Sequence, residues 1–117
     1  MKSAPTILAV EDDPRALRAL QQTLRHAGYS VLAARSGEEA LAALETSFPE
    51  LVLLDVSLPG LSGYDVCRRI RANPRTRVLP VVFLSAHERA PEEGGNTLHI
   101  MKPVLASELL KVVRLFV

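Results

Sequence analysis

The chain has little of what several classes of protein require. It contains one cysteine, Cys67, so it cannot form an internal disulfide, which predicts a cytoplasmic rather than a disulfide-rich secreted protein. It has no tryptophan and only 4% aromatic residues. No apolar run approaches the roughly 20 residues that cross a membrane. The 14 basic and 13 acidic side chains leave a net charge of +1. A charge this small predicts that the chain does not bind nucleic acid or a membrane directly.

Apolar residues are plentiful by contrast. They make up 48% of the 117 residues, which is too many for a disordered chain and enough for one hydrophobic core. The sequence shows no internal repeat, linker or low-complexity stretch. We therefore expect a single domain over residues 1–117.

Short apolar runs alternate with stretches of helical periodicity. Five strands are predicted, at Ile7–Val10, Tyr29–Ala33, Leu51–Asp55, Val81–Ser85 and Leu98–Met101. Four helices are predicted, at Pro14–Ala27, Gly37–Thr46, Gly63–Ala72 and Ala106–Phe116. Asp13 is the expected cap of the first helix, and Ser36 with Glu39 resembles a capping box before the second. Strands that alternate with helices predict a parallel sheet covered on both faces.

One segment departs from this alternation. Residues 86–97 separate the last two strands and contain Pro91, Gly94 and Gly95 but no apolar stripe. A mean helix of about 11–12 residues would leave nothing for the connecting loops. We expect no regular helix here, or one turn at most.

Charged side chains stand where several of the predicted strands end. Asp55 ends the most apolar run, Glu11 and Asp12 follow the first strand, and Lys102 follows the last. Ser85 ends the fourth strand. Parallel strands bring these ends to one edge of the sheet, where open α/β folds bind their ligands. The residues are therefore expected to form one site.

Three carboxylates held together repel one another unless a cation lies between them. Mg²⁺ prefers oxygen ligands and often joins carboxylates to a phosphate, whereas no set of histidines and cysteines suits zinc. Lys102 would add a positive charge, and Ser85 a hydroxyl donor. Such a pocket could bind a phosphoryl group beside a carboxylate that attacks it and becomes an acyl phosphate. Alternatively, Asp55 could cap a turn, and Glu11 and Asp12 could be solvated loop residues.

The segments that carry these residues resemble the receiver domain of bacterial response regulators, in order and over essentially the full chain. The matching segments are Val10–Pro14, Leu54–Gly63, Leu84–Ala86 and Met101–Pro103. The resemblance implies a flavodoxin-like five-stranded sheet in the order 2-1-3-4-5. It also implies a sensor histidine kinase or phosphotransfer protein as phosphodonor, and a downstream protein or output domain that the sequence does not name.

The resemblance further implies a role for each site residue. Asp55 would accept the phosphoryl group, and Lys102 and Ser85 would contact it. Mg²⁺ would be bound by Glu11, Asp12, Asp55 and the backbone carbonyl of Ser57. Lys102-Pro103 is expected to be a cis peptide. The phosphoryl transfer is self-directed, so we do not expect an enzyme with an external substrate.

Two departures from the family pattern concern signal output. The family's fourth helix is replaced by segment 86–97, and His99 stands three residues before Lys102, where an aromatic switch residue is common. His87, two residues after Ser85, could make dephosphorylation depend on pH. The alternative function is a pseudo-receiver, a phosphorylation-independent interaction module. A phosphatase is disfavoured because Ser57 stands where such enzymes commonly carry a second acid.

Overall fold

The computed structural model describes residues 4–86 and 97–117. Its five strands are β1 (Thr6–Val10), β2 (Ser30–Ala34), β3 (Leu51–Asp55), β4 (Val81–Ser85) and β5 (Thr97–Met101). Its four helices within the described ranges are α1 (Pro14–His26), α2 (Gly37–Thr46), α3 (Gly63–Ala72) and α4 (Ala106–Val113). None of these helices is long and apolar enough to cross a membrane. The predictions about segment 86–97 and His87 concern residues 87–96, which lie outside the described residues.

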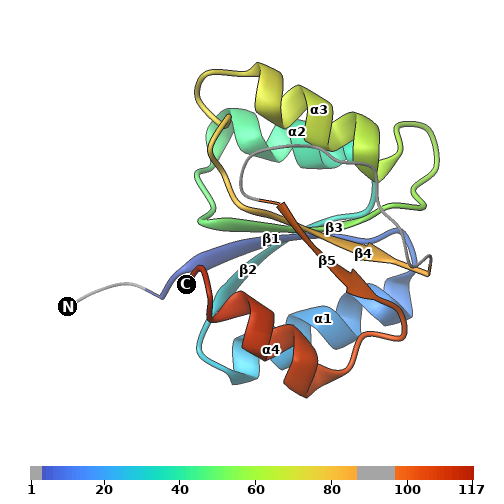
Figure 1. Ribbon diagram of the computed structural model, residues 1–117, viewed down its shortest axis with the longest axis vertical. Coiled ribbons are helices and arrows are strands. Elements are labelled where there is room, and N and C mark those ends of the chain that lie inside the picture. Colours follow the sequence, from blue (N-terminus) through green and yellow to red (C-terminus); the bar gives the residue numbers. More distant parts are fainter. Residues whose placement is uncertain (1–3, 87–96) are drawn as a thin grey trace.

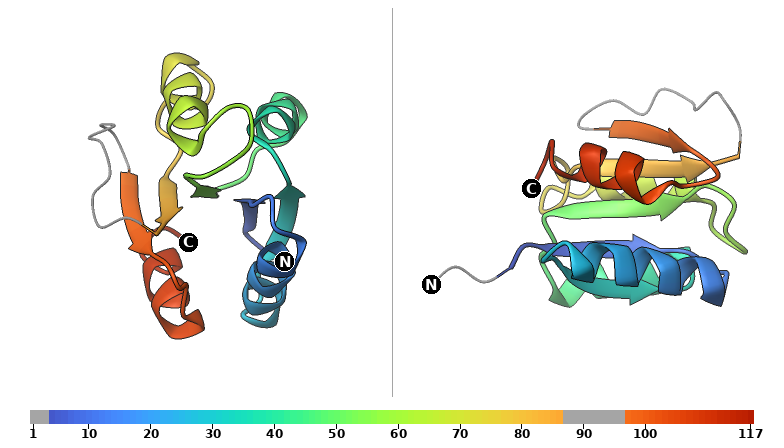
Figure 2. Two further views of the ribbon diagram at one scale, coloured as in Figure 1. Left: turned by 90° about the vertical axis from the view of Figure 1, so that its right-hand side faces the viewer. Right: turned by 90° about the horizontal axis from the view of Figure 1, so that it is seen from below.

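The strands form one parallel sheet in the order β2-β1-β3-β4-β5, as expected (Figure 1). Helices α2 and α3 cover one face of the sheet, and α1 and α4 cover the other (Figure 2). This arrangement buries the central strands on both sides, so every residue of β3 and β4 is buried.

Alternation along the strands divides the core into two halves. Val52 and Leu54 of β3 pack with the α2 and α3 side, whereas Leu51 and Leu53 pack with the α1 and α4 side. Successive side chains of a strand point to opposite faces of the sheet. Because both faces of β3 are covered by helices, every position of this strand except its last has to be apolar. Cys67 lies in the first half of this core, as a small buried residue.

The helix starts follow the local chemistry that the sequence predicts, with one difference. The Asp13 side chain accepts a hydrogen bond from the Arg15 N–H and caps α1, and the Ser36 hydroxyl accepts one from the Glu39 N–H. The Glu39 carboxylate, however, accepts from the N–H of Arg35 rather than from the capping residue. The predicted capping box is therefore only half formed.

Several predicted boundaries are wrong by one to three residues. Helix α1 ends at His26 rather than Ala27, and Gly28, whose φ is +99°, lies in the turn that follows it. The Tyr29 N–H donates to the Leu24 carbonyl and belongs to this turn, so β2 spans Ser30–Ala34 rather than Tyr29–Ala33. At the other end of the chain, α4 ends at Val113 rather than Phe116. The Phe116 N–H donates to the Val113 carbonyl three residues back, as in a tighter turn.

Candidate phosphoacceptor and metal site

The carboxylate of Asp55 lies at the carboxyl end of the central strand β3. The residue is only 2% exposed, and both of its oxygens are engaged. The Ser57 N–H donates to Oδ1 at 3.1 Å, and the Lys102 ammonium lies 3.2 Å from Oδ2. A buried carboxylate held in this way has a defined orientation toward the edge of the sheet.

Glu11 is the second buried acid, directly after β1. It is 2% exposed, and its backbone N–H donates to the Ala34 carbonyl at 3.0 Å, which continues the pairing with β2. Its Oε2 accepts from the Asp13 N–H at 3.2 Å, and its Oε1 lies 3.4 Å from the Lys102 ammonium. Two contacts from opposite sides therefore hold the Glu11 carboxylate in place.

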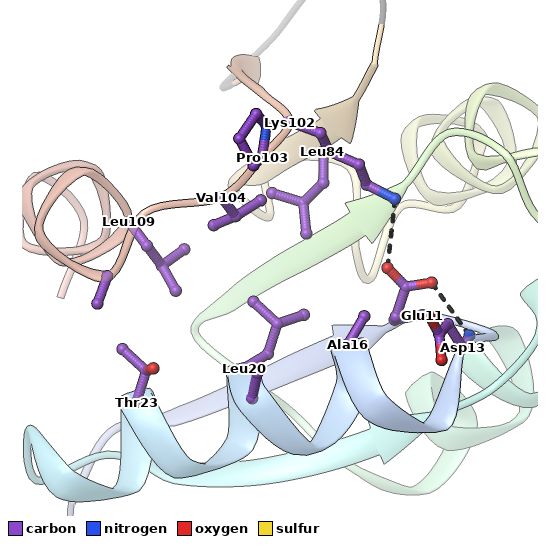
Figure 3. Close-up of a pocket in the computed structure, with 12 residues that line it drawn as sticks. Glu11, Asp13, Ala16, Leu20, Thr23, Leu84, Lys102, Pro103, Val104 and Leu109 are labelled. Carbon is purple, nitrogen blue, oxygen red and sulfur yellow. Dashed lines mark hydrogen bonds and ion pairs between the residues drawn. The ribbon is translucent and has the colours of Figure 1, made fainter.

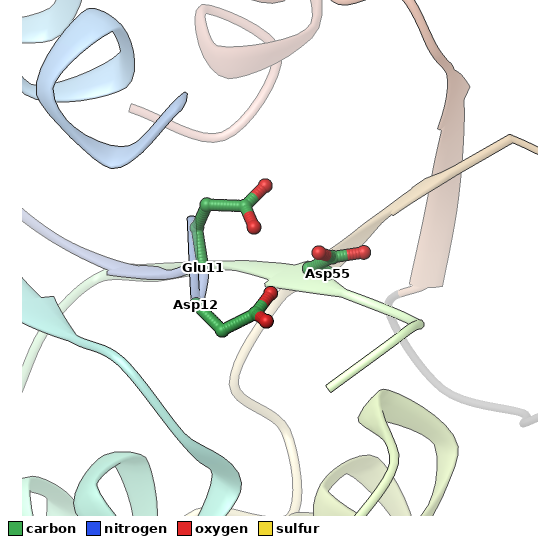
Figure 4. Close-up of side chains that lie close together, drawn as sticks. All are labelled: Glu11, Asp12 and Asp55. Atoms are coloured by element: carbon green, nitrogen blue, oxygen red, sulfur yellow. The ribbon is translucent and has the colours of Figure 1, made fainter. Parts of the chain in front are cut away.

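The third acid, Asp12, is more accessible to solvent and completes a cluster with the other two (Figure 4). One carboxylate oxygen from each of Glu11, Asp12 and Asp55 lies within 4.8 Å of the others. Oxygen ligands at this spacing suit a hard divalent cation, and the accessible Asp12 leaves room for bound water. The residues present therefore fit a magnesium ion.

Electrostatics in the cation-free cluster agree with this interpretation. Burial raises the pKa of the Glu11 carboxyl from its ordinary 4.5 to about 7, and its hydrogen bond and repulsion with Asp55 add to the rise. The Asp13 N–H and the charge of Lys102 oppose it. A second positive charge placed among the three acids would restore ionisation of Glu11 at neutral pH.

Lys102 reaches the site from the end of β5 and bridges the two buried acids. Burial lowers the pKa of its ammonium, but the hydrogen bonds and charges of Asp55 and Glu11 outweigh burial and leave the pKa above its ordinary value. The backbone N–H of Lys102 donates to the backbone carbonyl of Ser85 at 2.7 Å. The Lys102-Pro103 peptide bond is cis, as expected. Ser85 itself is 2% exposed at the end of β4.

Gly63, at the start of α3, supports the site in a way that the sequence did not reveal. Its N–H donates to the Val56 carbonyl at 3.0 Å, and a Cβ at this position would lie 2.4 Å from the Asp55 carbonyl oxygen. A capping box formed by Ser62 and Asp65 fixes the helix start. The pattern Ser62-x-x-Asp65 is a local signal from which that helix start could have been predicted.

A hollow of about 410 Å³ opens beside Glu11 and Lys102 (Figure 3). It lies between α1 and α4, and most of its lining is apolar, from residues such as Ala16, Leu20 and Leu109. The hollow thus leads from the surface between two helices to the two charged residues of the site.

The structure brings Glu11, Asp12, Asp55 and Lys102 together as the sequence predicts. Ser57 follows β3, and Ser85 is the last residue of the neighbouring strand β4. What the sequence did not indicate is that Lys102 contacts Glu11 as well as Asp55. Nor did it identify the backbone N–H groups of Asp13 and Ser57 as donors to these acids.

Comparison with known proteins identifies the class. Residues 7–114 match the family model described as the response regulator receiver domain. The chain belongs to this family, and its acidic pocket is of the kind that binds Mg²⁺ and is phosphorylated on aspartate in receiver domains.

Particular relatives agree with this assignment. The chain is 40% identical to the transcriptional regulatory protein AfsQ1 of Streptomyces coelicolor over 105 residues, which cover 86% of this chain and 45% of AfsQ1. It thus spans about half the length of the curated relatives it matches. A putative response regulator from Chloroflexus aurantiacus has a TM-score of 0.89 and 37% identity, with 97% of each chain covered. TrrA from Thermotoga maritima, solved with Mg²⁺-BeF, has a TM-score of 0.87 and 28% identity, covering 97% of this chain and 99% of TrrA.

Proposed function

We propose that residues 1–117 form one receiver domain that is phosphorylated on Asp55. The observation that supports this most is the buried Asp55 carboxylate. It is oriented by the Ser57 N–H and the Lys102 ammonium and lies beside two further acids. A carboxylate with this degree of positioning is suited to in-line attack on phosphorus.

The proposed transfer exchanges a phosphorus–nitrogen bond for a phosphorus–oxygen bond. An Asp55 oxygen forms a bond to the phosphorus of a phosphohistidine while the phosphorus–nitrogen bond breaks, and the histidine leaves with the electron pair and takes up a proton. Lys102 lies 3.2 Å from Asp55 and can stabilise charge on the phosphoryl oxygens, and Ser85 can donate its hydroxyl. Later hydrolysis of the acyl phosphate would regenerate Asp55. The chemistry is self-directed, so we do not propose an external substrate.

We propose Mg²⁺ as the cofactor, held by Glu11, Asp12, Asp55 and the backbone carbonyl of Ser57. When bound, the ion would neutralise negative charge on the transferring phosphoryl group. The support is the oxygen-only donor set within 4.8 Å and the raised pKa of Glu11 without a cation. The Mg²⁺-BeF complex of the similar protein TrrA adds to it.

We propose a histidine kinase or phosphotransfer protein in the cytoplasm as the phosphodonor. The hollow between α1 and α4 is a suitable contact surface because it is largely apolar and ends at Glu11 and Lys102. A helix of the donor that packs there would bring its phosphohistidine to the edge of the sheet.

Incubation with acetyl phosphate and Mg²⁺, followed by intact-mass measurement, tests the proposal. We expect a gain of one phosphoryl group that is lost in Asp55→Ala and retained in Glu45→Ala, an exposed acid of α2 outside the cluster. If the wild type neither gains the group nor binds Mg²⁺ and beryllofluoride, the pseudo-receiver alternative is supported instead. Phosphorylation that persists in Asp55→Ala would contradict the assignment of Asp55.

A further inference from the structure

A second hollow lies at the opposite end of the sheet from Asp55. It has a volume of about 410 Å³ and lies among the loops that precede β3 and β4 and the end of the chain after α4. The C-terminal end of the chain lies at this same end of the sheet (Figure 1). We call it the basal groove and define it by its lining residues Phe48, Arg75, Val78, Leu79 and Phe116.

The basal groove exposes apolar surface that the fold does not cover. Phe48 is 74% exposed and Val78 is 75% exposed, although both are large apolar side chains. Singly exposed apolar residues are ordinary, but two that line one hollow form a patch typical of an interaction site. Exposed Phe and Val side chains that line one hollow could anchor an apolar side chain of a partner.

The loop that carries Val78 is held in place, so the groove is formed before anything binds. The Arg71 guanidinium donates to the carbonyls of Arg77 at 3.1 Å and Leu79 at 2.6 Å. The Thr76 hydroxyl donates to the Ile70 carbonyl at 2.8 Å, and the Thr76 N–H to the Asn73 carbonyl at 3.0 Å. Preformed sites lose less conformational entropy on binding.

The charge beside the groove is positive. The Arg75 guanidinium lies 5.0 Å from the centre of the Phe48 ring, and Arg77 is exposed in the same loop. Neither arginine forms an ion pair with any carboxylate in the described part of the chain. The Glu50 carboxylate, which also lines the groove, is engaged by the Thr6 N–H. The guanidinium groups of Arg75 and Arg77 are therefore available to pair with the carboxylates of a ligand.

We propose that the basal groove binds an acidic peptide segment of a partner protein, with an apolar anchor next to carboxylates. The anchor would pack on Phe48 and Val78, and the carboxylates would pair with Arg75 and Arg77. A second copy of this chain suits the groove less well. A two-fold interface would place identical arginine-bearing loops against each other. This site is separate from the phosphoacceptor and does not depend on it.

Selection from a display library of random 12-residue peptides tests the proposal, followed by fluorescence anisotropy of an enriched peptide. We expect enriched peptides to combine aspartate or glutamate with a bulky apolar residue. Phe48→Ala and Arg75→Glu should each weaken binding at least tenfold. Leu105→Ala and Arg18→Glu, exposed residues of similar type elsewhere, should change it less than twofold, as should Asp55→Ala.

Three outcomes would overturn the proposal. The first is that no peptide is enriched above an unrelated control protein, or that the enriched peptides lack carboxylates. The second is that Phe48→Ala and Arg75→Glu leave the affinity unchanged. The third is self-association of the chain in sedimentation velocity that Phe48→Ala abolishes, because a second copy would then occupy the groove.

Discussion

Acidification of the magnesium-free protein from pH 8 to pH 5 should stabilise it through Glu11. The folded state holds this carboxyl with a pKa of about 7, whereas the unfolded chain has its ordinary 4.5. Between these values the folded protein binds a proton that the unfolded chain does not, so the free energy of unfolding rises as the pH falls through 7. The gain in the free energy of unfolding levels off below pH 4.5, the pKa of Glu11 in the unfolded chain.

The size of the effect follows from this difference in pKa. The difference between the folded pKa of about 7 and the ordinary 4.5 corresponds to at most about 3 kcal/mol, most of which falls between pH 8 and pH 5. For a domain of this length that is roughly 10 °C in Tm. The lowered pKa of Asp65 acts in the opposite sense, but its contribution is lost only as the pH falls below about 4.

Urea denaturation at pH 5, 6, 7 and 8 in EDTA provides the assay. Glu11→Gln should remove most of the pH dependence, whereas Glu45→Gln, a surface glutamate on α2, should retain it. Saturating Mg²⁺ should stabilise the wild type most at pH 8, where Glu11 is ionised. Parallel profiles for the wild type and Glu11→Gln, or wild-type stability that increases from pH 5 to pH 8, would refute the reasoning.

Two further predictions concern the same site. Mg²⁺ affinity, measured by calorimetry, should fall by up to about tenfold per pH unit below pH 7 because the ion competes with the Glu11 proton; affinity that stays constant from pH 8 to pH 5.5 would contradict this. Gly63→Ala should cost about 1–3 kcal/mol of stability in urea and weaken Mg²⁺ binding, because the added Cβ meets backbone next to Asp55. Gly28→Ala, at φ +99° with open space around it, should cost about 1 kcal/mol with no loss of Mg²⁺ affinity, and equal Mg²⁺ affinities in the two variants would count against a role for Gly63.

Much of the site could be predicted because its residues follow local patterns. Asp55, Glu11 and Lys102 each end an apolar run, and parallel pairing brings such ends to one edge whatever the details of packing. The order of the strands came from the family resemblance rather than from periodicity. Helix caps such as Asp13 were also predictable, because they depend on residues only two positions apart.

The remaining features depend on contacts between distant parts of the chain. The end of α4 at Val113 was mispredicted because the apolar period continues to Phe116 while the backbone tightens. Arg71 stands in an arginine-rich stretch with no distinguishing pattern, yet its guanidinium joins α3 to the loop before β4 and to Thr97 of β5. No local pattern specifies such a partner.

The composition of the site follows from local sequence patterns: three acids, a lysine and a serine stand at the ends of predicted parallel strands. Apolar periodicity depends on residues only a few positions apart, so it predicts the strands and the residues at their ends from the sequence alone. Tertiary structure alone decided that Lys102 bridges Glu11 and Asp55, that burial raises the pKa of Glu11, and that the basal groove leaves Phe48 exposed. Burial and ion pairing depend on every element packed around a group, so they exist only once the chain has folded.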